Sequence, residues 1–350
     1  MNSTEHSIPH SDPRSFPTRH PIERHWRFVS SPDSFFVDEV PSYLPSGEQG
    51  EHLFLHIRKQ GLTSQDVVRG LQETLGIHSK SVGVAGQKDK KATTTQWLSL
   101  TGVKEESLSD WSMPGVEVLE MKRHGNKLKT GHLRGNLFRL ALGEKTPEEV
   151  EAFRQDVAFL EEKGIPNAFG PQRFGKQRNN HLRGRELVLS GEKIKTSFHN
   201  KMLLSAYQAS LFNDLLAMRL RSDTLDTVFA GDRLKKHTTG GEFVCEDPVS
   251  DQPRADQLEL SPTAWLPGYK VHAAQGLPGQ WEQEILQREG LQQESFRAAG
   301  KIAKGTRRLL RIPLEQVEIE HSKECLWFSF FLPSGSYASV VLQQLGVRFS

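Results

Sequence analysis

Alternating hydrophobic and polar positions predict several β-strands in the part of the chain before Thr146. His52 to Arg58 has a two-residue period, which puts Leu53, Leu55 and Ile57 on one face of a strand. Phe35 to Glu39 is a shorter strand candidate with the same period. Further strands are predicted at Val82–Val84, Thr94–Leu100, Val116–Met121 and Leu137–Leu142.

Two helices in this part carry clear end signals. The segment Thr63-Ser-Gln-Asp66 has the pattern of a capping box, and the helix it begins should end near Leu75, before Gly76. A second helix is predicted from Thr146 to Lys163, with a proline in its first turn. Strands with one or two helices in this order indicate an α+β sheet domain.

The pattern changes in the middle of the chain and changes back near its end. Helical periods dominate from residue 166 to residue 307, with Gly-rich connections such as His237–Gly241. Strands return at Val317–Ile319 and Leu326–Leu332, and a helix is predicted from Tyr337 to Leu345. The helical segments predicted in between are Leu203–Leu220, Trp281–Glu289 and Glu294–Ala303. We therefore predict an α+β domain formed by residues 23–165 and 308–350, a helix-rich α/β insertion at 166–307, and a flexible tail at 1–22.

Composition excludes several classes of protein. The 350 residues are 36% hydrophobic and 25% charged, as in ordinary soluble proteins. No apolar run approaches the ~18 residues of a membrane span, and the N-terminal segment lacks the apolar core of a signal peptide. The two cysteines, Cys245 and Cys325, are too far apart for a disulfide scaffold or a cysteine zinc cluster. We expect a cytoplasmic protein.

Positive charge is segregated along the chain although the net charge is only +2. Residues 121–143, 173–185 and 301–311 contain lysine and arginine but no acid. Such blocks are typical of a face that binds a polyanion, although each block alone could be a solvated surface.

One acid, Asp89, lies among Lys88, Lys90 and Lys91 on a predicted loop between two strands. This carboxylate should be ionised at neutral pH, and catalytic groups often lie on such loops. The alternative is a solvated hairpin tip. A metal site at His52 and His56 is not expected, because residues four apart on a strand are about 13 Å apart.

Two further motifs combine aromatic and polar side chains. In Gly135-Asn-Leu-Phe138, Phe138 could stack on a base beside Asn136, or it could be a core residue at a strand entrance. In the segment Asn167 to Gly175, Arg173 and Phe174 suit nucleic acid, or form a structural corner. No phosphate loop, dinucleotide fingerprint, serine-hydrolase elbow or zinc-protease motif occurs, so we expect chemistry by protein groups without a cofactor or a metal.

Together these segments resemble the TruD family of tRNA pseudouridine synthases. The similar segments, in family order, are SPDSFFVDE, GEHLFLHIRK, AGQKDKKATTTQW, KLKTGHLRGNLF, PNAFGPQRFG and FFLPSGSYASVVLQQL. The resemblance implies a pseudouridine synthase catalytic domain, with a mixed, mostly antiparallel sheet and flanking helices, interrupted by the family's inserted domain. It also implies isomerisation of a uridine in tRNA, uridine 13, to pseudouridine by base flipping.

The same resemblance suggests roles for individual residues. Asp89 matches the catalytic aspartate, Phe138 the base-stacking aromatic residue and Asn136 the asparagine of the same motif. Attack at the ribose C1′ and at the base C6 are both open. The family's basic partner of the aspartate aligns with Val29 here, which leaves Arg27, Lys88 and Lys90 as candidates. Residues expected to contact the substrate are Lys88, Gln96, Lys127, Lys129, Arg173 and Phe174.

Two other classes of function compete with this one. A catalytically silent RNA-binding protein or RNA chaperone on the same scaffold would share the basic blocks but would not need Asp89. A methyltransferase or nuclease would need a glycine-rich cofactor strand or a carboxylate-metal cluster, and the sequence has neither. We expect a monomer that binds tRNA and no membrane.

Overall fold

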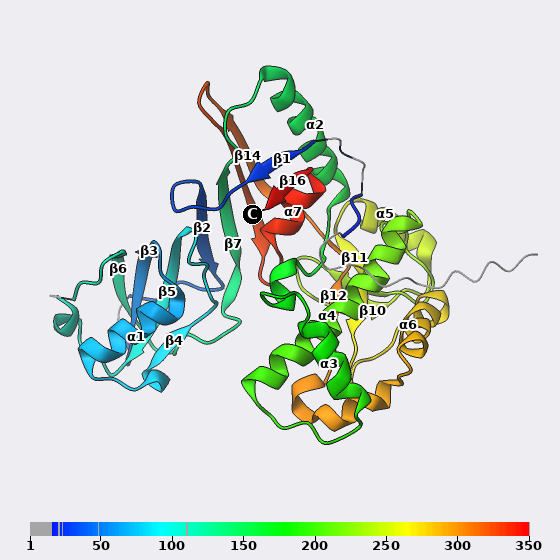
Figure 1. Cartoon of the computed structure of the whole chain (residues 1–350), viewed down its shortest axis with the longest axis horizontal. Helices are drawn as coiled ribbons and strands as arrows, with labels where there is room; N and C mark the ends of the chain where they lie inside the picture. The colour runs from blue at the N-terminus through cyan, green and yellow to red at the C-terminus, as the bar shows by residue number, and fades with distance from the viewer. Residues whose placement is uncertain (1–15, 20–21, 23, 48, 110, 350) are drawn as a thin grey trace, which may run out of the picture. The chain divides into compact units, whose positions relative to one another are not determined.

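The computed structural model describes residues 16–19, 22, 24–47, 49–109 and 111–349. Most of the predicted tail therefore lies outside the described residues. The chain forms two compact units, each described here by itself (Figure 1). The sheet unit contains residues 24–155, 314–338 and 347–349 as far as they are described, and the second unit contains residues 156–313 and 339–346 with the described residues before 24. The predicted domain limits at residues 166 and 307 stay a prediction.

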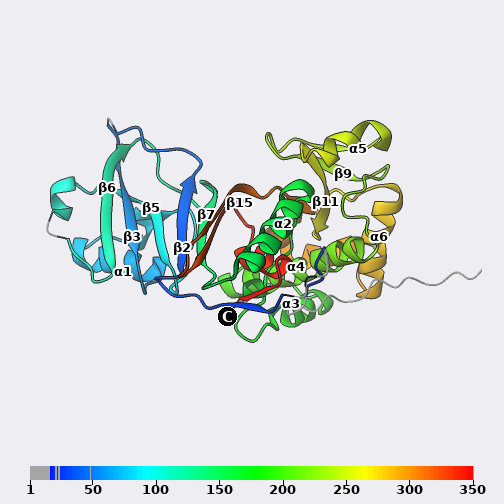
Figure 2. The same cartoon turned by 90° about the horizontal axis from the view of Figure 1, so that it is seen from above.

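The sheet unit is built on one eight-stranded sheet (Figure 2). Its strand order is β14-β15-β7-β2-β5-β3-β6, with β4 paired to β5. Only the β2–β5 pair is parallel, so the sheet is mixed and mostly antiparallel, as predicted. The strands are β2 (Phe35–Pro41), β3 (His52–Lys59), β4 (Val82–Val84), β5 (Thr93–Thr101), β6 (Val116–His124), β7 (Leu133–Ala141), β14 (Glu315–His321) and β15 (Leu326–Pro333).

Helix α1 (Ser64–Leu75) covers part of one face of this sheet. It begins with the predicted capping box, in which Thr63 and Asp66 exchange hydrogen bonds, and it ends at Gly76 in the left-handed conformation. Such a cap stabilises a helix by about 1 kcal/mol. Its residues Val67 and Leu71 pack on Leu53, Leu55, Ile57, Leu98 and Leu100 of β3 and β5, which are all fully buried.

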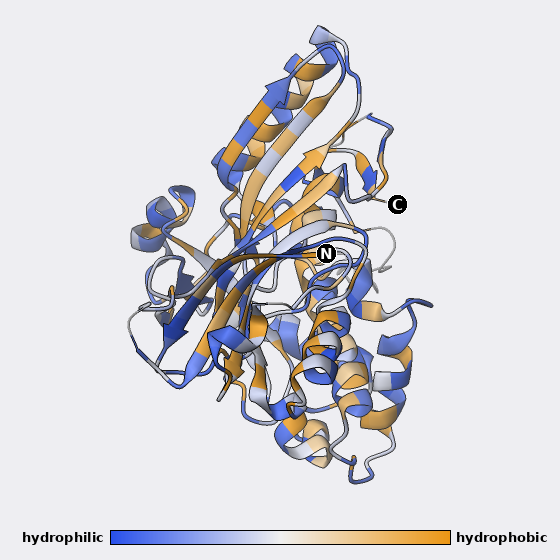
Figure 3. Ribbon diagram, turned by 90° about the vertical axis from the view of Figure 1, so that its left-hand side faces the viewer, coloured by the Kyte–Doolittle hydropathy of each residue, from blue (hydrophilic) through white to orange (hydrophobic). Residues whose placement is uncertain are grey.

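Aromatic residues pack farther along the sheet, on β2, β7 and β15. Phe138 lies between Phe35 and Phe330. The ring of Phe328 on β15 meets that of Phe153 on helix α2 (Pro147–Lys163) edge-on, with centroids 5.2 Å apart. Two short strands outside the large sheet, β1 (Trp26–Phe28) and β16 (Val347–Phe349), pair in parallel, and Phe28 packs on Phe35. Orange hydrophobic stretches and blue hydrophilic stretches both occur along the strands and helices of the ribbon (Figure 3).

The second unit contains helices and a small sheet. The sheet has the order β10-β9-β11-β12. An α/β insertion was predicted here, but none of these strands was predicted individually. Its elements are β8 (Ile165–Pro166), α3 (Asn180–Leu189), α4 (Phe198–Arg221), β9 (Arg233–Lys236), β10 (Glu242–Val244), α5 (Pro248–Asp256), β11 (Leu260–Leu266), α6 (Gly276–Arg288), β12 (Thr306–Leu309), β13 (Arg311–Ile312) and α7 (Ala338–Gln344). The segment predicted as a helix at 294–303 is a 3₁₀ segment, Gln293–Ala303, with a kink at Gly300.

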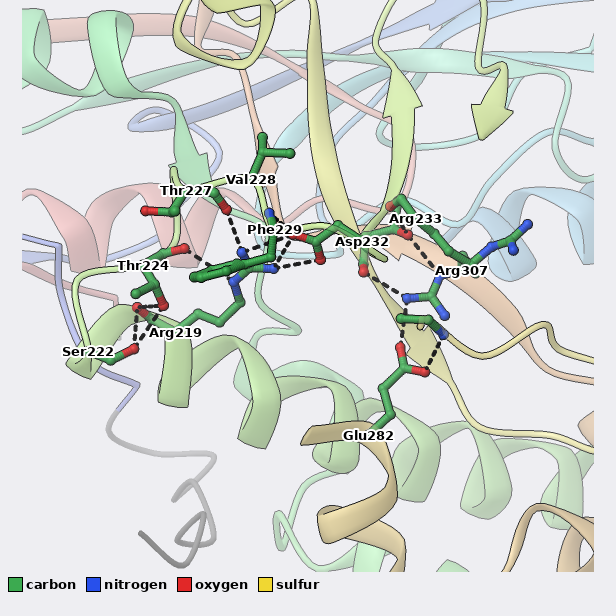
Figure 4. A network of polar contacts seen from close by, with 12 residues as sticks. Arg219, Ser222, Thr224, Thr227, Val228, Phe229, Asp232, Arg233, Glu282 and Arg307 are labelled. Atoms are coloured by element: carbon green, nitrogen blue, oxygen red, sulfur yellow. Dashed lines mark hydrogen bonds and ion pairs between the residues drawn. The ribbon is translucent and has the colours of Figure 1, made fainter. Parts of the chain in front are cut away.

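The strands of the small sheet were hard to predict because β9, β10 and β12 are only three or four residues long, and β9 and β12 carry lysine or arginine. Buried ion pairs neutralise arginine side chains inside the unit (Figure 4). Arg307 Nη2 on β12 lies 2.6 Å from Glu282 Oε1, and Arg219 Nη1 on α4 lies 3.0 Å from Asp232 Oδ1; all four side chains are at most 3% exposed. Arg307 of the basic block at 301–311 is therefore buried in an ion pair. Only other residues of this block are available to a surface that binds a polyanion.

Candidate active site

The Asp89 loop joins β4 to β5 within the sheet unit. Asp89, Lys90 and Lys91 are exposed, and Asp89 Oδ1 accepts a hydrogen bond of 2.9 Å from the backbone N–H of Lys91. This local turn fixes one carboxylate oxygen against the backbone, while the residue remains open to solvent. An exposed carboxylate in a defined direction can act as a nucleophile toward a bound substrate.

Lys88, the neighbour of Asp89, points into the protein. Its Nζ lies 2.8 Å from Glu39 Oε2 and donates a hydrogen bond of 2.7 Å to Asn136 Oδ1. Its side chain is 4% exposed and that of Glu39 is 1% exposed. The backbone N–H of Lys88 donates to Ser64 Oγ at 2.9 Å. Lys88 was a candidate ion-pair partner of Asp89, but its ammonium pairs with Glu39.

Glu39 and Asn136 face each other across β2 and β7, as their register shows. The second oxygen of Glu39, Oε1, accepts a hydrogen bond of 3.2 Å from the backbone N–H of Trp97. Glu39 therefore uses one carboxylate oxygen for the ion pair with Lys88 and the other for the hydrogen bond from the backbone. The predicted site residues Asn136 and Lys88 lie together, joined by a glutamate that the sequence analysis did not select.

Gln96 lies in the same buried network. Its Oε1 accepts a hydrogen bond of 2.6 Å from Ser64 Oγ, and the side chain is fully buried. Its Nε2 is buried with no hydrogen-bond partner among the described residues. Ser64 thus links Gln96 on β5 to the backbone of Lys88 on the Asp89 loop.

Lys59, the last residue of β3, holds the Asp89 loop through hydrogen bonds from its side-chain ammonium. It is fully buried, and its Nζ donates hydrogen bonds to the carbonyl oxygens of Leu62 (2.7 Å) and Asp89 (3.0 Å). Burial lowers the pKa of Lys59 to about 8, and the negative charge of Asp89 opposes this shift. Lys59 was missed in the sequence, although it continues the two-residue period of Leu55 and Ile57 and so stands at an apolar position of its strand.

Phe138 lies two residues from Asn136, and therefore on the same face of β7. Its ring centroid is 5.5 Å from that of Phe330 and 6.2 Å from that of Phe35, with nearly parallel planes, and the residue is 8% exposed. The structure thus brings Phe138 near the network as part of an aromatic cluster. A base-stacking role for it stays a prediction.

The basic segment before Phe138 is more exposed. Lys129 is exposed, and Lys127 is half-buried and donates a hydrogen bond to the carbonyl oxygen of Lys80. Between them, the N–H of Leu128 donates to Ser99 Oγ of β5 at 3.0 Å, which fixes this loop on the sheet.

The predicted residues Arg173 and Phe174 belong to the second unit. Arg173 Nη1 donates to Ser205 Oγ at 3.0 Å, and its guanidinium lies over the ring of Phe169 at 5.2 Å. Phe174 is fully buried and meets the ring of His181 edge-on at 5.4 Å. This motif therefore forms a packed corner, in which Arg173 is half-buried.

Neither a metal site nor a membrane helix is found in the described part of the chain. No three side chains of histidine, cysteine, aspartate or glutamate in it are grouped so that they could hold a metal ion. None of its helices is long and apolar enough to cross a membrane.

Known proteins match this chain over almost its whole length. A family model described as tRNA pseudouridine synthase D (TruD) matches residues 26–198 and 194–345. A tRNA pseudouridine synthase D of Thermus thermophilus is 43% identical over 315 residues, 90% of this chain and 86% of the relative. Its counterpart in Anaeromyxobacter dehalogenans is 42% identical over 321 residues, 90% of this chain and 91% of the relative. A Methanosarcina mazei structure of the same name has the same fold, with a TM-score of 0.75 at 22% identity over 95% of this chain and 96% of the other. The chain therefore belongs to the tRNA pseudouridine synthase D family.

Proposed function

We propose that this chain isomerises uridine 13 of tRNA to pseudouridine, with Asp89 as the nucleophile. The observation that carries the proposal is an exposed carboxylate on a loop that buried polar contacts hold in place: Lys88 N–H to Ser64, Lys88 Nζ to Glu39 and Lys59 Nζ to the Asp89 carbonyl. A nucleophile gains most from such fixation, because a reacting group already in position avoids an entropic cost during the reaction. The names of the relatives, tRNA pseudouridine synthase D, support the formation of pseudouridine in tRNA.

The chemistry needs only protein groups. The uridine leaves its stack, the bond between N1 and C1′ breaks, the uracil turns, and C5 bonds to C1′; the hydrogen on C5 then leaves as a proton, and N1 gains a proton. Asp89 either displaces N1 from C1′ and is itself displaced when C5 attacks C1′, or adds to C6 across the C5–C6 double bond and leaves again when that double bond re-forms. Both routes use a single exposed carboxylate.

The other predicted residues are proposed to act in two ways. Lys127 and Lys129 bind tRNA phosphates, Arg173 adds a cation in the second unit, and Asn136 and Phe138 border the uracil. Lys88, Gln96 and Phe174 are buried, so we assign to them the support of the neighbouring residues rather than the main contacts with RNA. We further propose that the protein is a cytoplasmic monomer.

Tritium release tests the proposal. Unmodified tRNA labelled with tritium at uridine C5 is incubated with the wild type, with Asp89→Asn and with Glu73→Gln, a matched carboxylate-to-amide change at an exposed position of α1. We expect release by the wild type and Glu73→Gln only, with tRNA affinity unchanged in Asp89→Asn. A tRNA with cytidine at position 13 should release no tritium above background.

Each part of the proposal has its own contrary result. Normal turnover by Asp89→Asn would refute the nucleophile assignment. Release from the tRNA with cytidine 13 would refute the position. Binding of tRNA without release by the wild type would indicate the silent RNA-binding protein.

A further inference from the structure

The ammonium of Lys59 connects three segments around the Asp89 loop. Lys59 ends β3, Leu62 lies in the turn before α1, and Asp89 lies between β4 and β5. The hydrogen bonds to the Leu62 and Asp89 carbonyl oxygens, at 2.7 and 3.0 Å, therefore hold the loop against the end of a central strand. Because the side chain is fully buried, water does not compete for these bonds.

The charges around Lys59 make Asp89 its main electrostatic counterpart. Asp89 and Asp66 favour the ammonium form, and Lys88 and burial oppose it, with the effect of Asp89 larger than that of Asp66. Lys88 is already neutralised by Glu39 at 2.8 Å. A buried lysine charge is costly unless it is compensated, and here the carbonyl oxygens of Leu62 and Asp89 and the negative charge of Asp89 compensate it.

Other basic residues near the loop are less suited to this role. Lys90 and Lys91 are exposed, where solvent weakens their interaction with a neighbouring carboxylate. Val29, which stands where a basic residue is expected by resemblance, is a hydrocarbon with 60% of its surface exposed.

We propose that Lys59 is the positioning residue of Asp89: its hydrogen bond to the Asp89 carbonyl fixes the backbone of the nucleophile, and its buried ammonium places a positive charge beneath the loop that carries the carboxylate. This inference rests on the proposed function for its catalytic part only. The fixation of the loop can be measured without a substrate.

The first measurement is hydrogen–deuterium exchange of the peptide covering residues 86–92 in the free protein. The variant Lys59→Met keeps most of the side-chain volume and removes the charge and both hydrogen bonds. Arg58→Met is the matched control, because Arg58 is the preceding residue of β3 and is exposed in an ion pair with Glu117. We expect exchange in this peptide to rise about tenfold in Lys59→Met and to stay unchanged in Arg58→Met.

The second measurement is the single-turnover rate of tritium release from tRNA. We expect Lys59→Met to lower this rate about 10- to 100-fold, with the Kd for tRNA within about threefold of the wild type, because a misplaced nucleophile affects chemistry more than binding. Lys59→Gln keeps an N–H donor without the charge and should retain more loop protection than Lys59→Met.

The pH profile separates the electrostatic role from a merely structural one. With a pKa of about 8, Lys59 loses its charge within the range that the assay covers, while the facing groups are Asp89, Lys88 and Asp66. The rate of the wild type should therefore fall above about pH 8 relative to Lys59→Met, and Arg58→Met should follow the wild type.

The possible outcomes are distinct. Unchanged loop exchange together with an unchanged single-turnover rate in Lys59→Met would overturn the proposal. If the wild type releases no tritium, the proposed function fails, and the exchange experiment still decides whether Lys59 fixes the loop. If Lys59→Met does not fold, the exchange of Lys59→Gln and the wild-type pH profile decide, and a profile that stays level from about pH 7 to pH 9 would refute the electrostatic role.

Discussion

Replacing Glu39 by glutamine would remove the charge from one side of a buried ion pair and leave the side-chain shape almost unchanged. The carboxylate now uses one oxygen for Lys88 Nζ at 2.8 Å and the other for the N–H of Trp97 at 3.2 Å. A glutamine has only one acceptor oxygen, so its NH₂ group must face either the ammonium or the backbone N–H. In both orientations two donors meet in a region without solvent.

The expected cost follows from this burial. Removing one partner of a buried ion pair typically destabilises a protein by about 3–5 kcal/mol, because the other charge is left without compensation. Glu117→Gln is the matched control: Glu117 forms an ion pair with Arg58 at 2.7 Å, but the two side chains are 60% and 47% exposed. That variant should lose less than about 1 kcal/mol.

Urea unfolding followed by tryptophan fluorescence measures the difference. The sheet unit holds four of the six tryptophans, Trp26, Trp97, Trp111 and Trp327, so its unfolding dominates the signal. In the double variant Glu39→Gln with Lys88→Met, the glutamine oxygen can accept from the N–H of Trp97, and no ammonium is left opposite its NH₂ group. We expect the two substitutions to cost at least about 2 kcal/mol less together than the sum of their separate costs. Additive costs, or a loss in Glu39→Gln no larger than in Glu117→Gln, would refute the reasoning.

Three further predictions concern RNA binding, the second unit and pH. Replacing Lys127 and Lys129 by alanine should weaken tRNA binding and reduce the slope of log K against log salt by about one to two units; an unchanged slope would show that neither lysine meets a phosphate. Arg307→Met should destabilise the second unit by about 3–5 kcal/mol in thermal or urea unfolding, since Glu282 is then buried without its partner, whereas exposed Lys301→Met should have little effect. Burial, aided by Arg311, lowers the pKa of His237 to about 4, so the folded state binds fewer protons than the unfolded state between about pH 4 and pH 6.5, and stability should fall as the pH decreases through this range. Urea midpoints of the wild type and His237→Gln at several pH values check this, and equal pH slopes would contradict it.

Local signals were sufficient to predict much of the sheet unit. Helix α1 begins and ends where the capping box and Gly76 indicate, because both signals act within a few residues of the backbone they fix. The period of β3 likewise identified its buried face, since Leu53, Leu55 and Ile57 are all fully buried. Pairing between distant strands, such as β1 with β16, is not encoded in either segment alone and was not predicted.

The small sheet of the second unit shows why buried charged residues are hard to predict from sequence. Its strand β12 (Thr306–Leu309) contains two arginines, and Arg311 follows in β13, so hydropathy gives no sign of burial. Arg307 is nevertheless buried, because Glu282 on α6 lies against it. A partner 25 residues away along the chain can be recognised only once the fold has brought the two side chains together.

The periodicity of the strands also explains which site residues could have been predicted from the sequence. Asp89 was recognisable from its lysine neighbours, whereas Glu39 and Lys59 were passed over although each continues the apolar period of its strand, after Val37 and Ile57 respectively. Burying a charged side chain on the apolar face of a strand costs several kcal/mol of stability unless the charge has a partner. A charged residue at such a position therefore predicts a buried polar contact, even when the partner is unknown. Here both contacts lead to the Asp89 loop, whose residues from Gln87 to Lys91 include no apolar side chain that could hold it by packing. A hydrophobic replacement of these charges could make the sheet more stable, but it would leave the loop without the directional bonds that orient its carboxylate.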